Sequence, residues 1–548
     1  MTRRTLLGGL AALGTSAVGT VSGRTRTATG GTDLKEAQNG DTFPTPEELE
    51  RFVDDLVAEH LGDLTPGAAV AIVEGDTTRL AKGYGKANVE TNRPVRADET
   101  VFRVGSVGKL VTWTAVMQSI EEGVLALDED VNTYLENSEV EIPDTYDEPV
   151  TLGHLGTHTA GFESALDPEV VSDADALAPL ETVLAEQQPA RIRPPGSAVG
   201  YSNYGAALAG HIVAEVHDTT FEDYVESEIF RPLGMNHSTF AQPVPDGHPG
   251  TLAAGHTRDG EAFTVLDKVF INMRPAGSLS ATPSDMAQFM SVHLGDGAIG
   301  ETRILDRSTA RRMHSVHHVR HPAVNNWRYG FYEYGAPEAN LLAHSGSTIY
   351  FMSLLVLAPD HDVGIFLNYN SDTAQPARLE QIIDRILDRY QLQPSPVQPD
   401  PTDKSGTQRR ADALSGEYSL TMLPERGPLH LVDVLAHLSV ETTDDGRLIT
   451  GNREWIESKP YVFHEVDGDD VLAFEMDGDE VDVLNMSSAQ QGVHEPVPFH
   501  ERQLVTGGVV AGSLSGFALS LLGWGGLGAW RRWNQYRTED GDGGDSGE

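Results

Sequence analysis

The sequence lacks cysteine altogether and is poor in lysine. Without cysteine, the chain can form no disulfide, thiolate zinc site or iron–sulfur cluster, and it has neither a cysteine nucleophile nor a lipid anchor on sulfur. Almost all positive charge is arginine, because the 548 residues include only seven lysines, at positions 35, 82, 86, 109, 268, 404 and 459. Few positions could therefore supply a lysine with a chemical role.

Positive charge is scarce beside negative charge. The chain has 39 Lys and Arg residues against 82 Asp and Glu residues, a formal net charge of −43. This balance excludes an ordinary nucleic-acid-binding protein, because a phosphate backbone attracts basic residues. The acidic residues are spread along the chain, which indicates a folded protein with an acidic surface. Such a surface repels itself unless salt screens it, and the composition resembles that of haloarchaeal proteins, so we expect a halophilic protein.

The N-terminus resembles an export signal. Residues 1–23 begin with the pair Arg3-Arg4, followed by Leu6-Leu7 and a weakly apolar stretch, as in twin-arginine signals. The alternative is an unstructured terminus that carries two arginines by chance. Residues 24–42 are rich in Thr and Gly and are expected to be a flexible lead-in.

A long uncharged run lies near the C-terminus. Residues 504–530 carry no charge, and about 20 apolar residues suffice to cross a bilayer. Arg531 and Arg532 follow, so we expect a single transmembrane helix with an acidic cytoplasmic tail at 531–548 and the remainder outside the cell. A buried soluble helix is the alternative. Small residues at spacing four could pair two such helices into a homodimer: Gly508, Gly512, Gly516 and Ser520.

Between the ends, composition divides the chain into two folded units. Residues 43–393 alternate strand-like runs, such as 68–73, with helix-like runs, such as 110–122. Residues 394–410 are rich in proline and predict a linker. Residues 411–500 contain short β-patterned runs separated by Asp-Gly pairs, a strong hairpin signal, and predict a small antiparallel sheet or barrel.

Ser106 and Lys109 form the first candidate for chemistry. They lie three residues apart, directly before an apolar run, so a helix that begins at Ser106 places both on one face. A serine hydroxyl needs a base to become a nucleophile, and a lysine shielded from water can lose its proton near neutral pH. The spacing alone arises easily by chance, and a surface pair one turn apart is the alternative.

Two further segments favour the chemical interpretation. Tyr201-Ser202-Asn203 follows a Pro-Gly turn, and His344-Ser345-Gly346 precedes a strand-like run. With Ser106-x-x-Lys109, in this order, they resemble the three motifs of the serine β-lactamase and penicillin-binding-protein superfamily: Ser-x-x-Lys, Tyr-x-Asn and Lys/His-x-Gly. The Tyr-x-Asn form resembles the branch of class C β-lactamases, D-aminopeptidases, DD-peptidases and family VIII carboxylesterases. Surrounding segments extend the resemblance over residues 43–393.

The resemblance implies a fold and a set of roles. The fold would be α+β, with an antiparallel sheet flanked by helices and a helical subdomain. Ser106 would be the nucleophile, Lys109 its proton acceptor, and Tyr201 the group that delivers the proton to the leaving group, with a pKa lowered by the lysine's charge. Asn203 would hold Lys109 or a substrate carbonyl. The third motif, with His344 and Gly346, would lie along the substrate, and N–H groups of Ser106 and Ser347 would bind an oxyanion.

His344 departs from the lysine common at this position. Its charge would vary with pH around the ordinary histidine range, whereas a lysine suits capture of a substrate carboxylate, as in β-lactams. We therefore expect a serine hydrolase of small-molecule or peptide substrates, an esterase or D-amino-acid peptidase rather than an efficient β-lactamase. The alternative is a non-catalytic surface sensor or scaffold that keeps the fold.

The resemblance implies no cofactor, and a metal site has to be checked because there are 20 histidines. His154 and His158 are spaced as in zinc proteases, but Leu155 stands where the glutamate is needed. Four further histidines match one helical face, which could bind a metal or could be a solvated polar face: His314, His317, His318 and His321. We expect no metal. The 411–500 unit could cap the active site or only separate it from the membrane.

Overall fold

The computed structural model describes residues 44–163, 170–394, 406–425 and 430–503, together with Val505 and Trp530. The expected signal, lead-in and cytoplasmic tail lie outside the described residues, as does nearly all of the expected transmembrane helix, including its glycine face. Within the described ranges, no helix has both the length and the apolar character needed to cross a bilayer.

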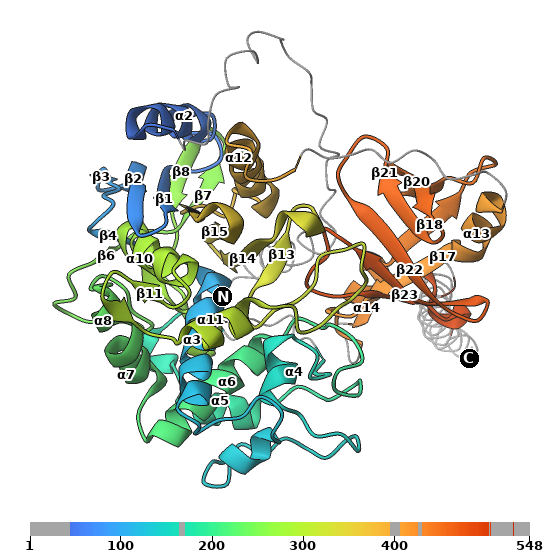
Figure 1. Ribbon diagram of the computed structural model, residues 1–548, viewed down its shortest axis with the longest axis horizontal. Coiled ribbons are helices and arrows are strands. Elements are labelled where there is room, and N and C mark those ends of the chain that lie inside the picture. Colours follow the sequence, from blue (N-terminus) through green and yellow to red (C-terminus); the bar gives the residue numbers. More distant parts are fainter. Residues whose placement is uncertain are drawn as a thin grey trace, which may run out of the picture.

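The described residues form two bodies that lie side by side (Figure 1). The larger is an α+β domain over residues 44–394, and the smaller is a closed antiparallel barrel that follows it in the chain. This arrangement confirms the α+β fold and the small β domain expected from the sequence.

A seven-stranded antiparallel sheet forms the centre of the larger domain. Its strands, in spatial order, are β13 (Tyr332–Tyr334), β14 (Leu341–Thr348), β15 (Phe351–Ala358), β16 (Val363–Tyr369), β1 (Gly67–Glu74), β2 (Thr77–Asn88) and β3 (Arg93–Pro94). Along β1, Val70 and Ile72 face one apolar cluster, whereas Ala71 and Val73 face another. Because successive side chains alternate between faces and both faces are buried, this strand is an uninterrupted apolar run.

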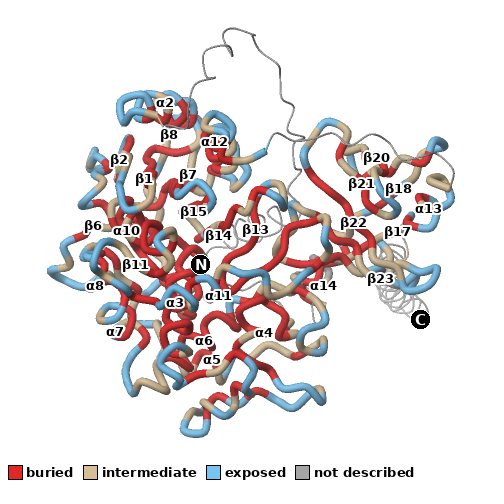
Figure 2. The backbone as a smooth tube through the Cα atoms, viewed as in Figure 1, coloured by how far each residue is buried: buried red, intermediate tan, exposed pale blue. Residues whose placement is uncertain are grey.

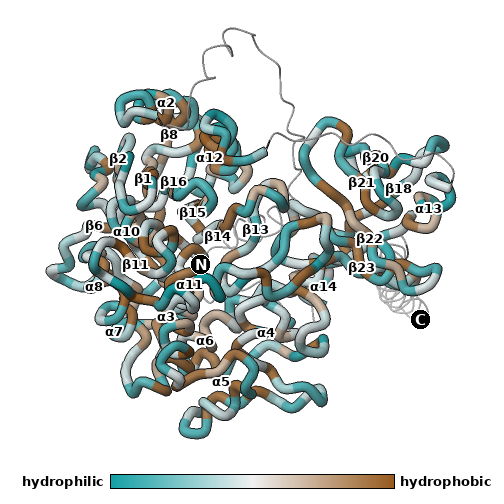
Figure 3. The backbone as a smooth tube through the Cα atoms, in the orientation of Figure 1, coloured by the Kyte–Doolittle hydropathy of each residue, from teal (hydrophilic) through white to brown (hydrophobic). Residues whose placement is uncertain are grey.

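Helices cover both faces of the sheet. On one face lie α2 (Pro46–Ala58) and α12 (Pro376–Arg389), and on the other lie α3 (Gly108–Glu121) and α10 (Pro283–Leu294). The backbone of the central strands and of α3 is mostly buried (Figure 2), and apolar residues follow much of the same path (Figure 3). Every residue of α3 from Gly108 to Ser119 is buried, as expected of a helix with apolar residues on all its faces.

A helical subdomain and small sheets complete the larger domain. The further helices are α4 (Leu152–Gly156), α5 (Leu180–Glu186), α6 (Asn203–His217), α7 (Phe221–Val225), α8 (Arg231–Leu233), α9 (Arg274–Gly277) and α11 (Arg307–His314). The short strands are β4 (Thr100–Arg103), β5 (Val170–Val171), β6 (Thr251–Leu252), β7 (His256–Asp259), β8 (Ala262–Val265), β9 (Phe270–Ile271), β10 (Ser280–Ala281), β11 (Ala298–Ile299) and β12 (Thr302–Arg303).

The smaller domain is a closed barrel around Trp455. Its strands are β17 (Gly416–Leu420), β18 (Leu438–Thr442), β19 (Leu448–Thr450), β20 (Arg453–Lys459), β21 (Val462–Glu465), β22 (Val471–Asp477), β23 (Glu480–Met486) and β24 (His494–Pro496), accompanied by α13 (Thr407–Leu414) and α14 (His430–Ala436). The hairpin at Asp477-Gly478 joins β22 to β23, as the sequence predicts. Helix α13 begins inside the segment expected to be a linker and adds Leu414 to the barrel core.

A buried imidazole pair is expected to make the stability of the larger domain depend on pH. His293 is 2% exposed, and its Nδ1 lies 3.0 Å from Nε2 of His314. Burial, and then the neighbouring His314, hold the pKa of His293 well below its usual value. In the unfolded chain His293 binds a proton near pH 6.5, whereas in the folded chain its imidazole stays neutral. The free energy of unfolding is therefore expected to fall as pH drops below 6.5.

We therefore expect His293→Gln to reduce the pH dependence of stability. Between pH 7 and pH 5 the wild type should lose about 2 kcal/mol of unfolding free energy through this one group, and the variant should lose that much less. Urea unfolding at the two pH values measures the difference. His361→Gln, at an exposed position, is the control. Equal pH dependence in His293→Gln and wild type would contradict the assignment.

Candidate active site

Ser106 lies in a short helical turn, residues Gly105–Val107, that leads directly into α3. The backbone just before it is fixed from three sides. Val104 N–H donates to the Leu279 carbonyl at 3.0 Å, Ser353 Oγ donates to the Val104 carbonyl at 2.7 Å, and Asn368 Nδ2 donates to the Arg103 carbonyl at 2.9 Å. The nucleophile candidate therefore occupies a rigid position at a helix N-terminus, as the sequence predicts.

Lys109 lies one turn further along, completely buried. Its Nζ is 3.0 Å from Ser106 Oγ, 2.8 Å from Asn203 Oδ1 and 2.7 Å from the carbonyl oxygen of Ala276. Burial holds the pKa of Lys109 well below its usual value, because water is excluded and the three described partners of the amine are all uncharged.

The three contacts determine where the N–H groups and the lone pair of the Lys109 amine point. The Asn203 and Ala276 oxygens can only accept hydrogen bonds, so they take two N–H groups of Lys109. In the neutral amine the lone pair then points to the third neighbour, the Ser106 hydroxyl. Lys109 is thus arranged to accept the proton of Ser106, the general-base geometry that a serine nucleophile requires.

Tyr201 and Asn203 come from the segment that begins α6. The Ser202 side chain caps this helix by accepting from Gly205 N–H at 3.0 Å, and this capping turns Asn203 toward Lys109. The Tyr201 ring lies 4.9 Å from Lys109 Nζ and packs on His158, with ring centroids 4.4 Å apart. The structure thus brings the first and second motifs together, and Asn203 contacts the lysine.

The expected lowering of the pKa of Tyr201 is wrong. Burial raises its pKa above the usual value of 10, and hydrogen bonding with the Ser106 side chain opposes this only in part. The reason is that Lys109, also buried, favours its neutral form and supplies little charge to stabilise a phenolate. Tyr201 is therefore a neutral phenol that can donate and accept a proton, not a phenolate base.

The third motif occupies the end of β14 that lies beside Ser106. A Cβ on Gly346 would stand 2.0 Å from the Val104 carbonyl oxygen, and a Cβ on Gly105 would stand 2.8 Å from the nitrogen of Ser347. Gly105 also has a φ of +55°. Both positions need glycine, because the nucleophile turn and the strand approach backbone to backbone.

The same approach places Ser347 for oxyanion binding. Ser345 N–H points to the β13 side of the strand, where it donates to the Tyr332 hydroxyl at 2.9 Å. N–H groups alternate along a strand, so Ser347 N–H points to the same side, and within β14 the pairing with β13 covers residues 341–343 and does not reach Ser347. Ser347 N–H on this side of the strand, together with Ser106 N–H, is therefore a candidate oxyanion donor, the role that the motif implies.

The expected pH-dependent charge on His344 is also wrong. This side chain is 2% exposed, and its Nδ1–H donates to the Ser345 carbonyl at 2.6 Å. Burial, and then the proximity of Lys109, lower the pKa of His344 to about 3. The imidazole is therefore neutral across the physiological range and offers no cation to a substrate carboxylate.

Sequence reasoning missed three groups that complete the site. The Ala276 carbonyl is a backbone group, and nothing in a sequence marks it as a lysine partner. Trp327 packs on His158 at 4.6 Å between centroids, and the Tyr332 hydroxyl fixes the strand of the third motif. The only available signal was the aromatic density of the segment from Trp327 to Tyr334.

Comparisons with known proteins agree with this geometry. Residues 49–387 match the family model described as Beta-lactamase. The chain belongs to the beta-lactamase family. This beta-lactamase-family chain is 32% identical over 276 residues to Penicillin-binding protein 4 of Amycolatopsis lactamdurans, a match that covers 48% of the chain and 68% of the relative. It is a serine hydrolase of this family.

Solved structures of the beta-lactamase fold resemble the chain. The octameric penicillin-binding protein homologue from Pyrococcus abyssi is 20% identical, has a TM-score of 0.54, and covers 82% of this chain and 99% of its own. The D-alanine carboxypeptidase AmpC from Burkholderia cenocepacia is 22% identical and has a TM-score of 0.50. The match covers 63% of this chain and 99% of the carboxypeptidase. Residues 1–393 make up less than three quarters of the chain. The match to the Pyrococcus abyssi protein covers 82% of the chain, so it must extend past the larger domain into the barrel.

The histidines do not gather on a helical face in this beta-lactamase-family domain. Helix α11 ends at His314, and the other three follow outside any helix, so the expectation of one helical face is wrong. His314 packs toward His293, whereas His317 stacks on Tyr329 with centroids 3.7 Å apart. Among the described residues, no group of three metal-type ligands is close enough to hold an ion.

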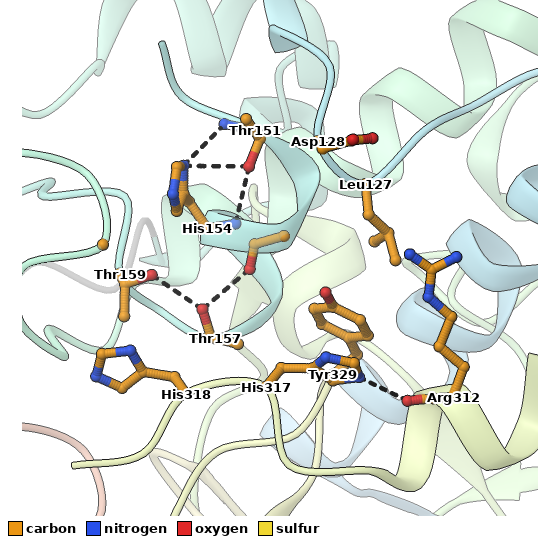
Figure 4. Close-up of a pocket in the computed structure, with 12 residues that line it drawn as sticks. Leu127, Asp128, Thr151, His154, Thr157, Thr159, Arg312, His317, His318 and Tyr329 are labelled. Carbon is orange, nitrogen blue, oxygen red and sulfur yellow. Dashed lines mark hydrogen bonds between the residues drawn. The ribbon is translucent and has the colours of Figure 1, made fainter. Parts of the chain in front are cut away.

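A separate cavity of about 440 Å³ lies against α4 (Figure 4). His154, His317 and His318 line it together with Arg312. None of the residues assigned to chemistry lines this cavity, so it is distinct from the beta-lactamase-family site.

Proposed function

We propose that the protein hydrolyses an ester or amide through a Ser106 acyl-enzyme, with Lys109 and Tyr201 as the proton-transfer groups. The observation that carries the proposal is the position of Lys109 Nζ, buried, bonded to two acceptors, and 3.0 Å from Ser106 Oγ. A buried lysine without a carboxylate is costly unless the protein uses its neutral form.

The geometry supports a complete reaction. Ser106 Oγ attacks the substrate carbonyl while its proton passes to Lys109 Nζ. The carbonyl oxygen becomes an oxyanion between the N–H groups of Ser106 and Ser347. Tyr201 gives its phenolic proton to the leaving group and regains one from Lys109. An acyl-enzyme remains, and water then releases the acid by the same proton transfers in reverse.

Esters, which need no cation beside the third motif, suit this site better than β-lactams do. The neutral His344 supplies no positive charge beside the third motif, where a carboxylate-bearing β-lactam gains from a cation. The similar structures include a D-alanine carboxypeptidase, a hydrolase with promiscuous acyltransferase activity named EstCE1, and SurE with D-Leu. These names belong to those proteins and support the same substrate classes here.

A non-catalytic sensor with the same fold is the second candidate. A sensor needs the fold but not a neutral lysine directed at the serine. The arrangement of Lys109, Asn203 and Ala276 therefore favours the enzyme.

We further propose that the enzyme is exported and works outside the cell in high salt. The support is in the sequence: the arginine pair near the N-terminus, the uncharged segment 504–530 followed by two arginines, and the net charge of −43. Pairing through the glycine face of that segment is part of the same proposal. Thermal melting in molar salt and in dilute buffer tests the halophilic element, and equal melting temperatures would contradict it.

A substrate panel tests the function. Ethyl acetate, a D-alanyl-D-alanine peptide and a chromogenic cephalosporin are compared with wild type and Ser106→Ala in high salt. We expect the ester or the peptide to be hydrolysed faster than the cephalosporin, and all activity to disappear in the variant. A cephalosporin turned over fastest would contradict the substrate ranking. Equal activity in both proteins would contradict the role of Ser106, and a folded wild type that hydrolyses nothing would favour the sensor.

A further inference from the structure

The barrel contacts the backbone of Tyr201, the residue proposed to pass protons. Tyr201 N–H donates to the Gln491 carbonyl of the barrel at 2.9 Å, and the adjacent Gly200 forms an isolated β-bridge with Gly492. On its other side, Gly200 N–H donates to the His158 carbonyl at 2.8 Å. The backbone of Tyr201 is thus held between the larger domain and the connection from β23 to β24.

Two side chains add to this junction. The Thr421 hydroxyl, at the end of β17, donates to the Val199 carbonyl at 2.5 Å and accepts from Val493 N–H at 3.0 Å. Trp327 Nε1–H donates to the Gln490 carbonyl at 2.7 Å. Because the Trp327 ring also packs on His158 and near Tyr201, the barrel supports the Tyr201 ring as well as its backbone.

Arg320 fixes the barrel connection itself. It is 5% exposed, and its guanidinium donates to the carbonyls of Ala489 at 2.6 Å, Gly492 at 3.0 Å and Met486 at 3.2 Å. A guanidinium presents several donors in one rigid fork, so a single side chain can hold three carbonyls of one loop. Arg320 therefore anchors the connection 486–493 to the larger domain.

Ion pairs hold the two domains together nearby. Arg193 Nε is 3.0 Å from one carboxylate oxygen of Glu495, and its Nη2 is 2.6 Å from the other. Arg193 also contacts Glu425 of the barrel. The guanidinium is largely buried, so these pairs are less screened by salt than exposed ones.

We propose that the barrel is part of the catalytic apparatus, and that Thr421, Arg320 and the connection 486–493 are positioning elements that set the hydroxyl of Tyr201. This inference rests on the proposed Ser-Lys-Tyr function. The barrel contributes no reacting group. It fixes the phenol that passes protons, and a misplacement of 1 Å at such a group costs about 10²-fold in rate.

The test uses full-length Thr421→Val, which keeps the side-chain shape and removes the hydroxyl that bonds Val199. We expect kcat/KM for ethyl acetate to fall about 10-fold, a smaller loss than for a full 1 Å displacement. Thr450→Val is the matched control, since its buried hydroxyl bonds Trp455 inside the barrel, and it should keep wild-type activity.

A second comparison separates positioning from general destabilisation. In a Tyr201→Phe background, Thr421→Val should cause no further loss, because the hydroxyl that it positions is gone. A further 10-fold loss in that background would contradict the inference, as would full activity of Thr421→Val in the wild-type background. Should Thr421→Val not fold, Trp327→Phe replaces it, because it removes the bond to Gln490 and keeps an aromatic ring beside His158. A wild type that never acylates Ser106 would instead overturn the proposed function itself.

Discussion

Replacing Lys109 by methionine should reduce kcat/KM for p-nitrophenyl acetate by about 10³-fold, within the 10²- to 10⁴-fold range of general-base catalysis. Methionine fills most of the lysine's volume and removes the amine that faces Ser106. The reaction loses its proton acceptor, because among the described residues the other group that bonds Ser106 is the phenol of Tyr201, whose pKa is raised. Initial rates at pH 7 measure the effect.

Two further variants make this result specific. Lys109→Arg should be as inactive as Lys109→Met, because a guanidinium keeps its proton at neutral pH. Lys82→Met removes a lysine of β2 that pairs with Glu50 and Asp54 of α2 and not with the residues around Ser106. This variant should keep wild-type activity. Activity in Lys109→Arg within 10-fold of wild type would contradict the neutral-amine mechanism.

Tyr201→Phe should lower kcat/KM for ethyl acetate by about 10²-fold and kcat/KM for p-nitrophenyl acetate by less than 10-fold. Both substrates give the same acetyl-enzyme, so the comparison isolates acylation. Ethoxide is a poor leaving group that needs the proton of Tyr201, whereas nitrophenolate leaves without one. The phenylalanine ring still packs on His158, so the fold of the segment is retained.

Tyr204→Phe is the matched control for this prediction. Tyr204 is also buried, and its hydroxyl donates to the Leu184 carbonyl at 3.1 Å rather than toward Ser106. It should keep wild-type ratios of the two activities. Equal losses on both esters in Tyr201→Phe would contradict proton delivery to the leaving group.

Much of the fold followed from local patterns in the sequence. The uninterrupted apolar run of β1, the buried α3 that follows Ser106, and the Asp-Gly hairpin of the barrel were all predictable, because burial and turn chemistry leave signals over a few residues. The beginning of α13 at Thr407 was not, since a proline-rich segment reads as linker until a helix packs on the barrel.

The site shows where local signals end. The three motifs predicted that Ser106, Lys109 and Tyr201 lie together. The pKa values of Tyr201 and His344, however, depend on burial by segments that are distant in the sequence. His344 titrates low because Trp327 and Tyr332 pack around it, and no motif encodes this exclusion of water. Likewise, the Gln491 carbonyl that holds Tyr201 comes from a separate domain and carries no sequence signature.

The most direct test of the central claim is the mass of the intact protein after incubation with a fluorophosphonate at pH 7, followed by peptide mapping. We predict one adduct per chain, on Ser106, in the wild type and none in Ser106→Ala. A folded wild type that stays unmodified, or an adduct on another residue that persists in Ser106→Ala, would contradict the account.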